Sequence, residues 1–218
     1  MIGLILSLFG KRKSAASVYP EGCRSDEALY ARFAEGDERA FNVLLDRHGD
    51  RVLGYLTRFF GDREMATDLT QEAFLKLVSA AQDFRGQCSF STFLFRIVRN
   101  LAIDVMRSRA SRPDSGAASL DQSRDEDGEG PTLGETVAGS APSGELRTLS
   151  GELSAALSAA LVQLPPEQRE VFLMREVEDL KFGEIAEVLR VNENTVKSRM
   201  HYAVMSLRQA LAGFRGAG

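Results

Sequence analysis

The polar side chains near the carboxyl end of the chain follow a helical spacing. Val196, Met200 and Ala203 predict the buried stripe of one helix. The opposite face then carries the groups that can hydrogen-bond base edges and phosphates in a major groove: Asn194, Thr195, Lys197, Ser198, Arg199 and Tyr202. A plain solvated helix face would carry similar charges, so the spacing alone leaves both interpretations open.

The residues just before this helix favour the DNA-binding interpretation. Phe182, Ile185 and Leu189 mark a short helix that ends at a tight connection over residues 190–193. Asn192 in that connection is the expected N-cap of the following helix. Two short helices joined in this way predict a helix-turn-helix.

A second cluster of cations lies near the middle of the chain. A predicted helix buries one face, and its other face carries Arg96, Arg99, Asn100 and Arg107. A glycine-containing loop with aromatic residues, 84–90, precedes it. Arginines beside aromatic rings suit single-stranded nucleic acid, where unstacked bases pack on flat side chains. A basic helix with ordinary core aromatics has the same composition, and this alternative stays open.

A third polar surface is acidic. Asp68, Gln71, Glu72 and Leu75 fall on one face of a helix predicted over about residues 63–80. Such a face would repel DNA, so it indicates either a protein partner or a solvated surface.

Helical spacings also predict the elements that position these clusters, and we find no convincing strand pattern. Before residue 112 they predict a short helix around Leu29 and Phe33, a helix from the N-cap Asp37 to about Gly61, the 63–80 helix, and one from Ser89 or Ser91 to about Arg109. Later in the chain a helix is predicted over 153–164, and the next restarts at Pro165 and Pro166. The predicted fold class is therefore all-α.

The charge distribution separates two small helical domains. Residues 113–152 carry 2 basic and 9 acidic side chains and are rich in Gly, Ser and Pro. Such a segment cannot bury enough surface to offset its ordering entropy. We therefore expect a flexible linker over 113–150, between domains at 25–112 and 151–212, with an extension at 1–24 expected to be disordered and a tail at 213–218.

The composition excludes several classes of protein. With 44% hydrophobic residues, 27% charged residues and a net charge of -4 over 218 residues, the chain is neither collagen-like nor wholly disordered nor a multispan membrane protein. Residues 1–9 are apolar, but a span needs about 20 residues, and the basic residues follow the run, unlike in a secretory signal. We therefore expect a cytoplasmic protein. Two alternatives for residues 1–9 stay open: an anchor that lies in the membrane interface, or a start codon that has been assigned too early.

The sequence shows no pattern typical of an enzyme or a metal site. Cys23 and Cys88 form no C-x-x-C pair and lie far from the histidines, which argues against a disulfide framework or structural zinc. His48 and His201 each stand alone, as packed or surface histidines do. Nucleophile-elbow, phosphate-loop and metalloprotease motifs are missing. We expect no catalytic activity, metal, cofactor or small-molecule substrate.

Three segments, in order, resemble the extracytoplasmic-function (ECF) subgroup of bacterial sigma-70 factors. DLTQEAFL at 68–75 resembles the segment that binds core polymerase. FRGQCSFSTFLFRIVRN at 84–100, continued to Arg109, resembles the promoter-melting and minus-ten segment. LPPEQREVF at 164–172 and NTVKSR at 194–199 resemble the minus-thirty-five domain. The resemblance covers about residues 25–110 and 150–212.

This resemblance implies a factor that directs core RNA polymerase to promoter DNA and opens it. The acidic face would dock on the beta-prime clamp, with the beta flap as a further contact, and the linker would run near the RNA exit path. The minus-thirty-five element would be read by the 194–202 residues given above, and the minus-ten element by Arg85, Gln87, Ser89, Phe90, Phe93, Arg96, Arg99, Asn100 and Arg107. The loop from Arg85 to Phe90, with Asn100, would hold a flipped base. The resemblance also implies control by an anti-sigma factor, soluble or membrane-bound.

The sequence departs from the family pattern at three places. Phe93 stands where a Trp is common, Arg190 occupies a turn position that often holds Gly, and Lys181 stands where Ser or Thr often caps a helix. An autonomous helix-turn-helix regulator with a ligand-sensing or dimerising first domain is the alternative function, and an RNA-processing enzyme is a third. Residues 153–218 carry 8 basic and 8 acidic side chains, which favours weak DNA binding by the chain alone.

Overall fold

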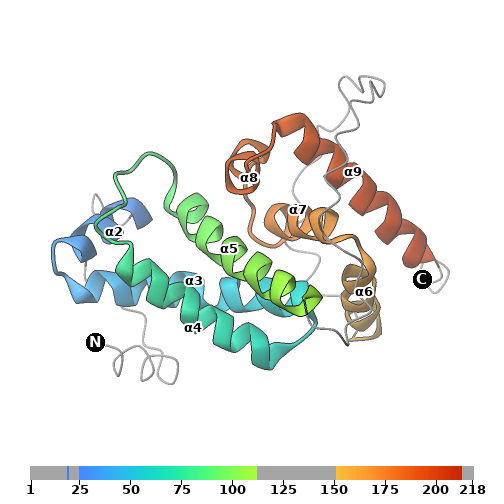
Figure 1. Cartoon of the computed structure of the whole chain (residues 1–218), viewed down its shortest axis with the longest axis horizontal. Coiled ribbons are helices and arrows are strands. Elements are labelled where there is room, and N and C mark those ends of the chain that lie inside the picture. Colours follow the sequence, from blue (N-terminus) through green and yellow to red (C-terminus); the bar gives the residue numbers. More distant parts are fainter. Residues whose placement is uncertain (1–18, 20–24, 112–150, 213–218) are drawn as a thin grey trace.

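The structure is a computed structural model that describes Tyr19, residues 25–111 and residues 151–212 (Figure 1). Apart from Tyr19, the expected extension, linker and tail lie outside the described residues. In the described part all regular structure is helical, which confirms the all-α prediction. The helices are α2 Asp26–Ala34, α3 Glu38–Phe60, α4 Arg63–Ser79, α5 Phe90–Ala110, α6 Gly151–Gln163, α7 Pro166–Glu176, α8 Phe182–Leu189 and α9 Glu193–Ala210.

Side-chain caps place the helix starts where the sequence predicts them. Asp37 accepts a hydrogen bond from the Arg39 amide at 3.2 Å and begins α3, which ends at Gly61 with a left-handed φ of 71°. Ser89, rather than Ser91, caps α5, because its hydroxyl accepts from the Thr92 amide at 3.1 Å. The open choice between the two serines is thereby resolved.

The first half, α2 to α5, packs around Tyr30. α3 packs against α2 and α4, and α4 packs against α5. The Tyr30 hydroxyl donates to the carbonyl of Leu77 near the end of α4, at 2.6 Å. Its ring lies 5.2 Å from both Phe84 and Phe90 and 5.9 Å from Phe93, measured between ring centroids. Burial of each aromatic side chain of this kind contributes roughly 1.5–3 kcal/mol to the free energy of folding.

An ion-pair cluster ties the start of α2 to α3. His48 is buried, and its Nε2 lies 2.7 Å from Asp26 Oδ2, while Arg47 donates to Asp26 Oδ1 at 2.6 Å. Burial would raise the pKa of the Asp26 carboxyl, but His48 and Arg47 outweigh it and hold that pKa below its ordinary value. His48 is thus a packed histidine.

The second half consists of α6 to α9, with the α8–α9 pair arranged as the predicted helix-turn-helix. α9 packs against both α7 and α8, and α6 also contacts α9. Val171, Ile185, Val196 and Ala203 are fully buried between these helices. None of the described helices is long and apolar enough to cross a membrane.

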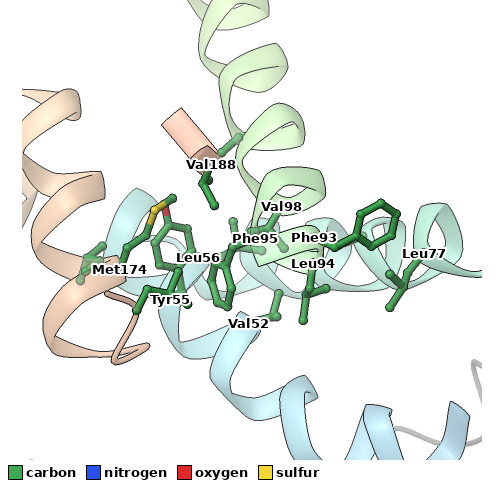
Figure 2. Packing of buried hydrophobic residues seen from close by; sticks show 14 of the residues in the cluster. Val52, Tyr55, Leu56, Leu77, Phe93, Leu94, Phe95, Val98, Met174 and Val188 are labelled. Atoms are coloured by element: carbon green, nitrogen blue, oxygen red, sulfur yellow. The ribbon is translucent and has the colours of Figure 1, made fainter. Parts of the chain in front are cut away.

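The two halves pack against each other, which the sequence did not predict. α5 lies against α8, and α3 lies against α6 and α7 (Figure 1). Figure 2 shows Met174 and Val188 of the second half reaching toward Tyr55, Phe95 and Val98 of the first. All five side chains are buried. One apolar cluster therefore spans both halves.

Candidate nucleic-acid interface

Three local features mark the ends of the helices in the helix-turn-helix. Asn192 Oδ1 accepts from the Thr195 amide at 2.7 Å and from the Thr195 hydroxyl at 3.0 Å, which begins α9. Arg190 ends α8 in the left-handed region, with φ 57°. The Lys181 amide donates to Glu184 Oε2 at 2.9 Å, so Glu184 satisfies the backbone amide at the start of α8 although Lys181 itself provides no Ser or Thr cap. The unusual residues at 181 and 190 are thus accommodated within the motif.

The outer face of α9 presents most of the predicted minus-thirty-five residues to solvent. Asn194, Lys197, Ser198 and Tyr202 are exposed, Tyr202 with 57% of its surface. Lys197 pairs with Glu193 one turn earlier at 2.8 Å, an exposed contact that DNA phosphate can replace at little cost. This face has the groups and the access that major-groove recognition needs.

Two predicted residues of α9 are engaged within the protein. Thr195 is half-buried and its hydroxyl bonds to Asn192. Arg199 is half-buried, and its guanidinium lies 3.7 Å from the carboxylate of Glu170 on α7. The sequence reading missed His201 and Met205, which are exposed on the same face as Ser198. Their spacing of three and seven residues from Ser198 was the available signal.

The predicted minus-ten residues divide into an exposed, a half-buried and a buried set. Arg85, Gln87, Asn100 and Arg107 are exposed. The loop that carries the first two turns at Gly86, whose φ of 69° lies in the left-handed region that glycine adopts without strain. These four side chains are free to approach DNA in the present arrangement.

The aromatic residues of this cluster lie inside the first half. Phe90 has no exposed surface and Phe93 retains 8%. The Phe90 amide donates to Glu27 Oε1 of α2 at 2.8 Å, and the Arg96 guanidinium lies over the Phe93 ring at 5.4 Å. In this arrangement both rings pack in the core beneath the loop and α5. For these two residues the structure agrees with the alternative interpretation, a basic helix with ordinary core aromatics.

Ser89 and Arg99 contact the second half. The Ser89 hydroxyl donates to Glu184 Oε1 of α8 at 2.9 Å. Arg99 Nε donates to Glu170 Oε2 of α7 at 3.1 Å. Burial raises the pKa of the Glu170 carboxyl, although Arg99 and Arg199 act to lower it.

The acidic face of α4 is present as a continuous surface. Asp68 and Glu72 are exposed, and Gln71 and Leu75 are half-buried beside them. Glu72 pairs with Lys76 at 3.5 Å. The face thus offers carboxylates around a partly exposed leucine, a composition suited to a basic protein surface.

Within the described ranges, no three side chains from His, Cys, Asp and Glu are grouped so that they could hold a metal ion. Cys88 is a free, half-exposed thiol, and burial raises its pKa.

Comparison with known families gives two matches in chain order. The sigma-70 region 2 profile matches residues 44–112, and the sigma-70 region 4 profile matches residues 154–207. The first match contains the acidic face and the 84–100 cluster, and the second contains the helix-turn-helix.

Curated relatives cover most of the chain. The chain is 34% identical to the RNA polymerase sigma-H factor of Pseudomonas aeruginosa over 85% of its own length and 93% of that protein. It is 32% identical to the ECF RNA polymerase sigma-E factor of Haemophilus influenzae, over 82% and 91% respectively. It is also 32% identical to the ECF RNA polymerase sigma factor SigW of Bacillus subtilis, over 81% and 91%.

Solved structures share the fold. CnrH, solved in complex with the cytosolic domain of CnrY, matches with a TM-score of 0.62 at 23% identity, over 86% of this chain and 97% of that one. The sigma factor RpoE of Bartonella quintana, solved with the anti-sigma factor NepR, matches with a TM-score of 0.57 at 19% identity, over 79% and 96%. With both regions matched in order and relatives above 30% identity along most of its length, the chain belongs to the ECF sigma factors of the sigma-70 family.

Proposed function

We propose that this chain directs core RNA polymerase to two-part promoters and opens them, in the cytoplasm and without catalytic activity of its own. The observation that carries this proposal is the exposed polar face of α9 in a helix-turn-helix that follows a region 2 domain on the same chain. A sigma factor needs this pair, because it must bind the polymerase and read two separate DNA elements.

The upstream element is read by α9. Asn194, Lys197, Ser198 and Tyr202 supply an amide, a cation, a hydroxyl and a phenol on one exposed face. The amide and hydroxyl can discriminate base edges, while Lys197 neutralises phosphate and positions the helix. Arg199 joins this set once it leaves Glu170.

The downstream element is held by the 84–89 loop and α5. Arg85, Gln87 and Asn100 are exposed and can bond the edges of an unstacked base. Extruding a base costs a few kcal/mol, which pocket contacts must offset. Phe90 and Phe93 act from inside by holding the loop in place, so their contribution is positional.

The polymerase contacts are assigned to two surfaces. The face of α4 that carries Asp68, Gln71, Glu72 and Leu75 docks on the beta-prime clamp, and the second half contacts the beta flap. Exposure of both carboxylates supports the first assignment. We place the domains at 25–112 and 151–212, with the 113–150 linker running between them near the RNA exit path. The matched ranges 44–112 and 154–207 fall within these limits and support the division into two domains.

The decisive experiment is transcription from genomic DNA fragments by core bacterial RNA polymerase, with and without this chain, followed by sequencing of RNA 5′ ends. We expect new discrete start sites that share a spaced pair of upstream elements. Absence of new starts and of polymerase association, together with tight binding of the chain alone to duplex DNA, would instead support an autonomous regulator.

We also propose that an anti-sigma factor, soluble or membrane-bound, controls this chain. Of the similar solved structures, RpoE was obtained with the anti-sigma factor NepR and CnrH with the cytosolic domain of CnrY, which motivates the proposal. Affinity purification from inducing and non-inducing cultures tests it. Recovery of polymerase subunits alone under both conditions would count against it.

A further inference from the structure

We propose that Arg190, in the connection between α8 and α9, binds a phosphate group of the duplex beside the upstream promoter element. The proposal rests on the proposed function, because Arg190 meets DNA only if α9 enters the groove there. The sequence pattern marks this position only as one where glycine is common, and the structure shows what an arginine adds to it.

Arg190 occupies the point in the motif that lies nearest to a DNA strand when the helices dock. It is the C-cap of α8 and comes two residues before Asn192, the N-cap of α9. In a helix-turn-helix the second helix lies in the major groove with its first residues at the base edges, while the first helix crosses the DNA backbone. A long side chain in the connection between them is therefore placed to reach phosphate, which positions the protein without reading sequence.

The side chain of Arg190 is available for such a contact. It is exposed, and its guanidinium makes no hydrogen bond or ion pair with any residue that the structure describes. The two cations on the first turns of α9 are engaged instead: Lys197 lies 2.8 Å from Glu193, and Arg199 lies 3.7 Å from Glu170. Arg190 alone of these three can bind DNA without giving up a carboxylate, and a guanidinium can donate two hydrogen bonds to one phosphate.

The backbone of Arg190 gives an independent reason to assign its side chain a role. Its φ of 57° lies in the left-handed region, which is unfavourable for a residue with a Cβ. Glycine would make the same turn without this strain. Strained conformations of this kind gather at functional sites, where a useful contact outweighs the cost. What arginine supplies here that glycine lacks is the exposed cation.

The test measures binding of polymerase holoenzyme to a labelled duplex over a salt series, by fluorescence anisotropy. The duplex carries the region upstream of a start site found in the transcription experiment, and a second duplex has one base pair of the upstream element changed. Each phosphate contact contributes about 0.9 to the slope of log affinity against log salt. We expect Arg190→Gly to lower the slope by about this amount and to weaken binding about fivefold at low salt, equally on both duplexes.

Two further variants separate the charge from the fold. Arg190→Lys keeps a cation in the same strained conformation, so it should keep the wild-type salt slope. Arg208→Ala removes an exposed cation near the other end of α9 and should change neither slope nor affinity. Urea denaturation of Arg190→Gly should show a chain at least as stable as wild type, because glycine relieves the strain. Weaker DNA binding by a more stable variant excludes misfolding as the cause.

Three results overturn the proposal. An unchanged salt slope in Arg190→Gly would make Arg190 a solvated cation. Weakened binding to only one of the two duplexes would indicate a base contact. Weakened binding to core polymerase without DNA would assign Arg190 to a protein interface.

Failure of this contact can be told apart from failure of the proposed function. If wild-type holoenzyme starts transcription and the Arg190 variants bind the duplex as wild type does, the function stands and the contact is rejected. If the chain directs no start sites but binds duplex DNA alone, the same salt series on the chain alone tests Arg190. A chain that binds no duplex in either setting overturns both.

Discussion

Removal of the Lys197 side chain from α9 should disturb the folded chain little. It is exposed and pairs only across the surface with Glu193. We expect Lys197→Ala to weaken binding of polymerase holoenzyme to the promoter by roughly 1 kcal/mol and to lower the salt slope by about 1. Affinity for core polymerase stays unchanged. Filter binding over a salt series measures both quantities, and Arg208→Ala near the end of α9 is the control. An unchanged salt slope would remove Lys197 from the DNA interface.

Glu178 makes the stability of the folded chain depend on pH. Its side chain has no exposed surface, and burial raises its pKa from 4.5 to about 7, although Arg51 and then Arg58 act to lower it. Because the pKa is higher in the folded chain, the protonated carboxyl is favoured there. The associated stability is complete below 4.5 and is lost as the pH rises through about 7.

We therefore expect Glu178→Gln to remove part of the pH dependence of unfolding. Urea denaturation from about pH 5 to about pH 8 measures the free energy of unfolding of both proteins, and their difference isolates Glu178. That difference should change by up to about 3 kcal/mol across the range, with wild type losing stability as the pH rises. Parallel pH profiles would show that Glu178 titrates normally.

At the scale of the element, the connection between α8 and α9 carries a removable strain. Arg190 is exposed and has a φ of 57°. The left-handed conformation costs a non-glycine residue roughly 1–2 kcal/mol, and glycine loses about 0.5–1 kcal/mol of chain entropy on folding. The first effect is larger, so we expect Arg190→Gly to stabilise the second half by about 0.5–1 kcal/mol. Urea denaturation checks this, with Arg190→Ala, which keeps the strain, as the control.

Helix α4 gives a prediction for the polymerase contact. Reversing charge at two exposed positions, Asp68→Arg with Glu72→Arg, should weaken core polymerase binding at least about tenfold, because like charges across an interface repel strongly. Titration of core polymerase into the labelled chain measures this. The double variant Glu35→Arg with Asp46→Arg changes net charge equally at exposed positions elsewhere. Equal affinities of the two double variants would reject the α4 face as the docking surface.

The helices could be predicted because their signals are local. Asp37, Gly61, Ser89 and Asn192 mark helix ends through contacts within a few residues, and apolar spacing reveals each buried face. The same spacing correctly predicted that Asn194, Lys197, Ser198 and Tyr202 lie on the exposed side of α9. It could not distinguish Phe90 from a DNA-contacting ring, because burial of that ring depends on α2.

At the scale of the whole molecule, the contact between the halves was not predictable from sequence. Arg99 and Glu170 are 71 residues apart, and Arg51 and Glu178 are 127 apart, with the predicted linker between them. Periodicity identifies which side chains are apolar but not which helix will cover them. Tyr55 of α3 is buried, and part of its cover comes from the other half.

The shared apolar cluster predicts how the chain unfolds. Because both halves bury side chains in it, calorimetry of the wild type should show one cooperative transition. Combining Arg51→Ala with Glu170→Gln should separate that transition into two, with the smaller second half melting first. Two resolved transitions already in the wild type would show that the halves fold independently.

Tyr30 connects the two proposed binding surfaces of the first half, the polymerase-docking face of α4 and the melting loop. Its hydroxyl grips the end of α4, the proposed docking helix, while its ring touches Phe84, Phe90 and Phe93 at the base of the proposed melting loop. Burial raises the pKa of Tyr30, so the hydroxyl keeps its proton and its bond at every physiological pH. A small displacement of α4 on the polymerase clamp would be passed through the Tyr30 ring to the proposed melting loop. Polymerase binding and capture of the DNA strand would then be coupled through Tyr30. The Tyr30→Phe variant keeps the ring but loses the hydrogen bond to the Leu77 carbonyl, so it would remove this coupling.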